Sequence, residues 1–175
     1  MMAEKKASGK EQASAREQAA AEERASATEQ QKQFYRIEEM LNEHGFYIST
    51  TVGMSMYPLL RNRRDTIVIR PAAVHLKKYD VPLYKCGDAY ILHRIVKVTP
   101  DGYVICGDNC RHREYDITDH QIIGVLSEIV RDEKKVRMDG LWYRIYCRVW
   151  VASYPIRAVC KIGKMAINRL IRRKA

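Results

Sequence analysis

The segment from Phe46 to about residue 137 consists of short stretches in which apolar and polar residues alternate, separated by tight turns. The alternation is clearest over residues 46–52, 65–70, 90–98 and 121–131. A period of two is typical of strands with one buried face. Turn residues follow closely, as in Thr99-Pro100-Asp101-Gly102. The pattern therefore predicts a mainly β fold, either a small coiled antiparallel sheet or a partly open barrel.

The two ends of the chain have different patterns. Residues 1–33 contain no aromatic or branched aliphatic side chain, which predicts a disordered or helical tail without a core of its own. Residues 34–45 have helical spacing and end in His44-Gly45. After residue 137, apolar positions recur every three or four residues with Arg and Lys between them, and Pro155 interrupts the run. We therefore expect a tail (1–33), a core (34–137) and two basic amphipathic helices (138–175).

Charge is concentrated at the C-terminus. The formal net charge is +10, and residues 131–175 hold thirteen basic and only three acidic side chains. This asymmetry predicts contact with an anionic surface, which could be a membrane, a nucleic acid or an acidic partner. The N-terminal segment shows no helix-turn-helix pattern, and the charge lies at the other end, so nucleic acid is disfavoured. Aromatic residues within residues 142–154 favour a membrane interface and packing on the core about equally.

The lengths of the apolar segments and the number of cysteines indicate where the protein is located. The N-terminus lacks the apolar core of a signal peptide. Residues 141–171 are broken by Arg and Lys and never offer the ~18 apolar residues of a spanning helix. The five cysteines, an odd number, predict reduced thiols. We expect a cytoplasmic protein without a cofactor, and a peripheral membrane contact is one of the two alternatives left open for its C-terminal helices. Cys106, Cys110 and His112 lack paired zinc-ligand spacing, so no metal is expected either.

Four residues are candidates for chemistry. Ser55 lies in the turn Gly53-Met54-Ser55-Met56-Tyr57-Pro58, where glycine allows a sharp bend and backbone N–H groups can face an oxyanion. His93 lies in an apolar stretch, where burial favours the neutral imidazole that a general base requires. Asp108 follows in a Gly-Asp-Asn turn, and Asp116 comes eight residues later. Either carboxylate could orient the imidazole, and the residues alone do not decide between them.

The ordered motifs resemble the catalytic core of the signal-peptidase-like serine peptidases, which include type I signal peptidases and self-cleaving repressor peptidases. The similarity covers residues 51–131. It rests on the Ser55 turn, Asp80–Tyr84, the Leu-His-Arg segment around His93, the Gly-Asp-Asn turn and residues 122–126. It implies a serine nucleophile at Ser55 and a histidine base at His93, as in the archaeal and endoplasmic-reticulum branch. Asp108 and Asp116 match the acidic positions, and Met56 and Pro58 match residues that shape the turn.

The chain departs from the family pattern at three places. Residues 31–47 are too polar for the anchoring membrane helix that usually precedes the serine. Gly53 stands where signal peptidases carry an oxyanion-hole hydroxyl, and Arg64-Asp65 replaces Gly-Asp.

The resulting prediction is a serine endopeptidase that cleaves peptide, protein or leader segments. The alternative is a weakly active or inactive peptide-binding module with the same fold. A DNA-binding repressor with a self-cleaving domain is disfavoured.

Overall fold

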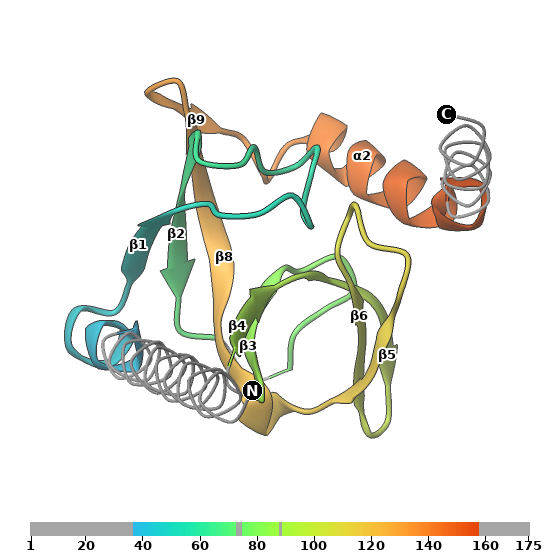
Figure 1. Cartoon of the computed structure of the whole chain (residues 1–175), viewed down its shortest axis with the longest axis horizontal. Coiled ribbons are helices and arrows are strands. Elements are labelled where there is room, and N and C mark those ends of the chain that lie inside the picture. Colours follow the sequence, from blue (N-terminus) through green and yellow to red (C-terminus); the bar gives the residue numbers. More distant parts are fainter. Residues whose placement is uncertain (1–36, 73–74, 88, 158–175) are drawn as a thin grey trace, which may run out of the picture.

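The computed structural model describes residues 37–72, 75–87 and 89–157, and the statements below concern these residues (Figure 1). The fold is mainly β, as the sequence predicts. One antiparallel sheet has the order β1-β2-β8-β3-β4, with β9 paired to β8. Its strands are β1 (Tyr47–Thr50), β2 (Asp65–Arg70), β3 (Pro82–Cys86), β4 (Ala89–Leu92), β8 (Ile122–Arg131) and β9 (Lys134–Val136). The curled sheet forms half of a barrel.

The remaining strands form a second antiparallel sheet. It contains β5 (Arg94–Thr99), β6 (Gly102–Cys106) and β7 (Glu114–Ile117) in that order. A 3-10 turn (Asp119–Gln121) leads from β7 into β8. The sequence predicts one strand over residues 90–98, but the chain forms two, because it leaves the first sheet after Leu92 and enters the second at Arg94. His93 is therefore the residue at which the chain passes from one sheet to the other.

Two apolar cores hold these layers together. The larger lies within the curl of the first sheet and includes Ile67, Ile69, Leu83 and Ile129, together with Ile37 and Leu41 of the preceding helix. The smaller contains Tyr84, Ile95 and Ile105, which come from both sheets. The helix ends at His44, as predicted, with Gly45 at a φ of 72°.

Helix α2 (Leu141–Ala152) packs with one face against the β core and leaves the other in solvent. Tyr143 and Tyr146 pack on the larger core, whereas Trp142 is 82% exposed. Of the two roles that the sequence left open for these aromatic residues, packing on the core therefore holds for Tyr143 and Tyr146. No helix in the described part of the chain has the length and hydropathy needed to cross a bilayer. The predicted tail (1–33) and most of the second basic helix lie outside the described residues.

Candidate active site

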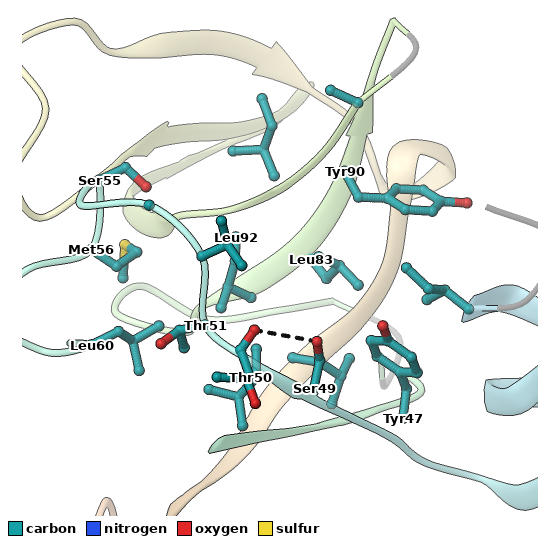
Figure 2. A pocket seen from close by; sticks show the side chains of 17 residues that line it. Tyr47, Ser49, Thr50, Thr51, Ser55, Met56, Leu60, Leu83, Tyr90 and Leu92 are labelled. Carbon is teal, nitrogen blue, oxygen red and sulfur yellow. Dashed lines mark hydrogen bonds between the residues drawn. The ribbon is translucent and has the colours of Figure 1, made fainter. Parts of the chain in front are cut away.

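A groove runs along the concave side of the first sheet and ends at the serine turn (Figure 2). Its volume is about 590 Å³. The two walls come from β1 and β4, the outermost strands of the sheet order, and the floor comes from apolar side chains of β2 and β3. Thr51, Gly53, Ser55 and Met56 line the end nearest the turn. An apolar floor between two strand edges can accept an extended peptide.

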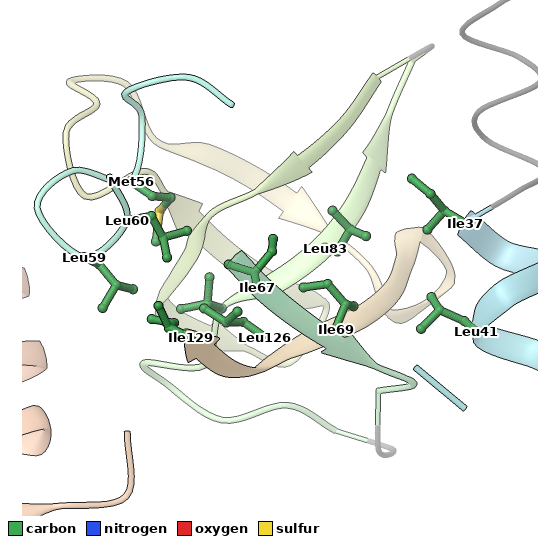
Figure 3. Close-up of a cluster of buried hydrophobic side chains, with 11 residues drawn as sticks. Ile37, Leu41, Met56, Leu59, Leu60, Ile67, Ile69, Leu83, Leu126 and Ile129 are labelled. Carbon is green, nitrogen blue, oxygen red and sulfur yellow. The ribbon is translucent and has the colours of Figure 1, made fainter. Parts of the chain in front are cut away.

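The turn that carries Ser55 is anchored from below. Met56, Leu59 and Leu60 are buried in the larger core (Figure 3). Gly53 has a φ of 97°, a backbone conformation that favours glycine, and its N–H donates to Asn62 Oδ1 over 2.9 Å. A residue with a side chain would be strained at this position. Ser55 remains half-buried at the rim of the groove.

A buried carboxylate fixes the far end of the same loop. Asp65 accepts hydrogen bonds from the Arg61 backbone N–H and side chain and from the Arg131 guanidinium. Thr51 Oγ1 donates to the Asp65 carbonyl oxygen over 3.2 Å, so both ends of the loop meet. Burial alone raises the pKa of Asp65, but the hydrogen bonds from Arg131 and Arg61 outweigh it and lower that pKa to about 2.

His93 is buried, and a glutamate holds its ring. The Nδ1 atom of His93 lies 2.9 Å from Glu114 Oε1. Tyr84, fully buried, donates its hydroxyl to Glu114 Oε2 over 2.5 Å and lies 3.3 Å from the same Nδ1. A carboxylate only accepts hydrogen bonds, so His93 donates through Nδ1–H and its Nε2 keeps the lone pair. This is the tautomer that a general base requires.

Burial and the neighbouring carboxylate act on His93 in opposite directions. Burial disfavours the imidazolium and is the larger effect, so the pKa of His93 is lowered, while Glu114 partly offsets the shift. The lowered pKa favours the neutral imidazole. Burial is also the main reason that the pKa of Tyr84 is raised, and the Glu114 carboxylate adds to it, so Tyr84 stays protonated and donates.

Neither predicted aspartate contacts His93. Asp108 pairs instead with Arg94, which donates from Nε and Nη2 to its two carboxylate oxygens over 2.8 Å each. Tyr146 of α2 donates to the same carboxylate over 2.9 Å. Asp116 is exposed, and its carboxylate forms no hydrogen bond or ion pair with another described residue. The expectation that Asp108 or Asp116 orients His93 is therefore wrong in this geometry; Glu114 does so.

The sequence contained a partial signal for Glu114. It lies two residues before Asp116, so strict alternation would place both on one face of β7. The positive φ of Asp116 (60°) and the register shift between β6 and β7 break that alternation. Glu114 faces His93, while Asp116 faces solvent. No strand was predicted over residues 114–117, and the contact spans 21 residues of chain, so the pairing was not visible in the pattern.

The Nε2 side of His93 faces the Gly107 turn. A Cβ added to Gly107 would lie 2.8 Å from His93 Nε2 and 2.8 Å from the Ser55 carbonyl oxygen, so the two are neighbours across this glycine. Asn109 ties the turns together, since its backbone N–H donates to the Ser55 carbonyl over 2.7 Å and its Nδ2 to the Met54 carbonyl over 3.0 Å. Ser55 and His93 share one site but are not hydrogen-bonded to each other.

The other candidate ligands do not form a metal site. In the ranges that the structure describes, no three His, Cys, Asp or Glu side chains are arranged to hold an ion. Cys106 instead donates its thiol to the carbonyl oxygens of Gly107 and His112. The four described cysteines form no disulfide.

Compared with known proteins, the chain matches no family model, and no curated protein matches it.

Proposed function

We propose that this chain is a serine endopeptidase of the signal-peptidase-like type. Ser55 is the nucleophile, His93 is the general base and Glu114 orients His93. The observation that carries the proposal is a buried His93 whose Nδ1 is held by Glu114 and whose Nε2 side faces the Gly107 turn, which the Ser55 carbonyl oxygen also approaches. Among described residues, neither the Ser55 hydroxyl nor its backbone N–H has a hydrogen-bond partner, so both are available to a substrate.

The chemistry follows from these positions. The Ser55 oxygen attacks the scissile carbonyl carbon while His93 Nε2 takes the hydroxyl proton. Glu114 stabilises the imidazolium that forms, and the Ser55 N–H donates to the developing oxyanion. His93 then returns the proton to the leaving amine. Nucleophile–base hydrogen bonds often form only when substrate is bound, which fits a Ser55 and a His93 that are not hydrogen-bonded to each other here.

The groove supports an extended peptide as the substrate. The outer edges of β1 and β4 offer backbone N–H and C=O groups, and a peptide between them would pair with strand edges. Its alternate side chains would face the floor formed by Ile67, Ile69 and Leu83. We therefore expect cleavage of peptide or leader segments with apolar side chains beside the cleaved bond.

The test is cleavage of a complex peptide library, read by mass spectrometry of new termini. Ser55→Ala and His93→Ala are expected to abolish cleavage. Ser49→Ala is the matched control, because Ser49 also lines the groove but lies outside the reacting group, and it is expected to cleave like the wild type. Equal cleavage by the wild type and Ser55→Ala would overturn the proposal.

The second candidate is a peptide-binding module without catalysis. The absent Ser55–His93 hydrogen bond and the glycine at position 53 favour it. It predicts that peptides bind in the groove with equal affinity to the wild type and to His93→Ala. It also predicts that no library peptide is cleaved and that no acyl-enzyme forms.

We also propose that the outward face of α2 contacts an anionic membrane surface. Leu141, Trp142, Ile145 and Val149 are exposed on this face, within the segment that holds all the excess positive charge. Apolar side chains flanked by Arg and Lys suit a headgroup layer. Sedimentation with phosphatidylglycerol-containing vesicles is expected to fall in Trp142→Ser but not in Tyr115→Ser, which removes an exposed aromatic on β7. Equal binding to uncharged phosphatidylcholine vesicles would contradict the proposal.

A further inference from the structure

The proton-accepting atom of His93 already has a neighbour, the thiol of Cys110. The Cys110 Sγ lies 3.9 Å from His93 Nε2, within hydrogen-bonding range for sulfur. The backbone N–H of Cys110 donates to the Gly107 carbonyl over 2.9 Å, which holds the thiol in this turn. Because Glu114 fixes the Nδ1–H tautomer, the thiol is the donor and Nε2 the acceptor.

The contact between the Cys110 thiol and the His93 ring depends on Gly107. A Cβ on Gly107 would lie 2.7 Å from Cys110 Sγ and 2.8 Å from His93 Nε2, closer than real Cβ contacts come. Any other residue would force the thiol and the imidazole away from this position. The two groups therefore converge on a space that only glycine leaves open.

Cys110 differs from the other described cysteines. Cys106 and Cys147 are buried, and burial raises the pKa of both thiols, that of Cys106 to about 11. Cys86 is exposed at the end of β3, and no described histidine forms a hydrogen bond with its thiol. Cys110 combines partial exposure with a neutral imidazole as its hydrogen-bond acceptor, the arrangement that activates a thiol.

The thiol lies beside the base but outside the groove. Ser55 is among the residues that line the groove, and Cys110 is not. A peptide held between β1 and β4 is therefore presented to Ser55. Chemistry at Cys110 acts on the availability of His93 Nε2 instead of on the substrate.

We propose that Cys110 is a covalent modification site for low-molecular-weight disulfides, activated by His93, and that its capping withdraws His93 from peptide hydrolysis. His93 Nε2 takes the thiol proton, and the Cys110 sulfur attacks one sulfur of the disulfide. The S–S bond breaks, the leaving thiolate takes the proton from His93, and a mixed disulfide remains. Cys110 is oxidised and the leaving half is reduced to a thiol. The activation stands on geometry alone, whereas the effect on hydrolysis rests on the proposed function.

The activation is tested without any peptidase assay. The full-length protein is treated with iodoacetamide, and separately with glutathione disulfide, and each cysteine is followed by peptide mass spectrometry. Cys110 is expected to react about tenfold faster than the exposed Cys86. The rate at Cys110 should fall about tenfold in His93→Ala and less in Glu114→Gln, while Cys86 is unchanged. Equal reaction rates at Cys110 and Cys86 would overturn the proposal. So would a Cys110 rate that is the same in the wild type, His93→Ala and Glu114→Gln.

The effect on hydrolysis is tested with the same disulfide. Wild-type cleavage should be lost on treatment and return with a thiol reductant. In Cys110→Ala, whatever cleavage is measured should be insensitive to the disulfide, whereas Cys86→Ala should remain sensitive. Sensitivity retained in Cys110→Ala would refute the site. Absence of cleavage in every sample would refute the proposed function, and the labelling rates would still decide whether His93 activates Cys110.

Discussion

The ion pair between Arg94 and Asp108 is buried, so its contribution can be measured as protein stability. Their side chains are 0% and 2% exposed and share two hydrogen bonds of 2.8 Å. Asp108→Asn keeps the shape but leaves the Arg94 charge buried without its counter-ion. Breaking such a pair typically costs about 3–5 kcal/mol, a large part of the 5–15 kcal/mol that stabilises a domain. We expect the free energy of unfolding to fall by about that amount.

Urea unfolding followed by tryptophan fluorescence measures this loss directly. Trp150 donates its indole N–H to the Asp108 carbonyl over 3.0 Å and so reports on the same region. Asp116→Asn is the matched control, since its carboxylate is exposed, and it is expected to change stability by no more than about 0.5 kcal/mol. The double variant Arg94→Met, Asp108→Leu should recover part of the loss, because no unpaired charge is then buried.

Two results would refute this reasoning. The first is a loss below about 1 kcal/mol in Asp108→Asn, which would mean that the pair is not held in a dry interior. The second comes from the titration of His93 followed by NMR. Besides burial, Glu114 and then Asp108 act on the pKa of His93, with Glu114 the stronger. A larger shift in Asp108→Asn than in Glu114→Gln would return the orienting role to Asp108.

Three further variants test the site and its support. Glu114→Gln removes the charge that opposes burial, so the pKa of His93 should fall further. The acid limb of kcat/KM then moves to lower pH, while kcat falls about 10- to 150-fold through loss of a hydrogen bond to the imidazolium. The pKa of Asp65 is lowered in the folded protein, so its ion pairs stabilise the fold above the unfolded pKa of 3.8, and this stabilisation is lost as the pH falls toward about 2. Asp65→Asn should therefore lower the free energy of unfolding by about 2 kcal/mol at pH 7. In urea unfolding, the stability of this variant should depend less on pH between those two values. Gly107→Ala should lower stability by about 1–3 kcal/mol and reduce cleavage, because its Cβ meets the Ser55 carbonyl at 2.8 Å; unchanged unfolding and cleavage would contradict the packing described.

The mainly β fold was predictable because alternation marks strands with one buried face. Residues 65–70 and 122–131 show it clearly, and they form β2 and β8 at the middle of the first sheet. The division of residues 90–98 into β4 and β5 was not predictable. The alternation continues through His93, and only the pairing of β4 with β3 and of β5 with β6 separates the two strands.

Some features of the candidate site follow from the local sequence, whereas others depend on how distant strands pair. The sharp turn at Ser55 and the burial of His93 follow from neighbours in sequence. The partner of His93 depends instead on where β7 pairs with β6, with Ile105 opposite Glu114. From the sequence, the Asp of the Gly-Asp-Asn turn was a candidate partner of His93. In the structure, Asp108 binds Arg94, the residue next to His93 in the chain.

Because Arg94 and His93 are adjacent, contacts link the outer helix to the candidate site. His93 and Arg94 are consecutive in nearly extended chain, so one contacts Glu114 while the other contacts Asp108. From α2, Tyr146 binds the Asp108 carboxylate and Trp150 binds its carbonyl. The next residue, Asn109, holds the Ser55 carbonyl. The turn that contains Asp108 and Asn109 is thus bound by α2 on one side and by the serine turn on the other. The placement of Ser55 relative to His93 therefore depends on α2, although α2 contributes no residue to the groove.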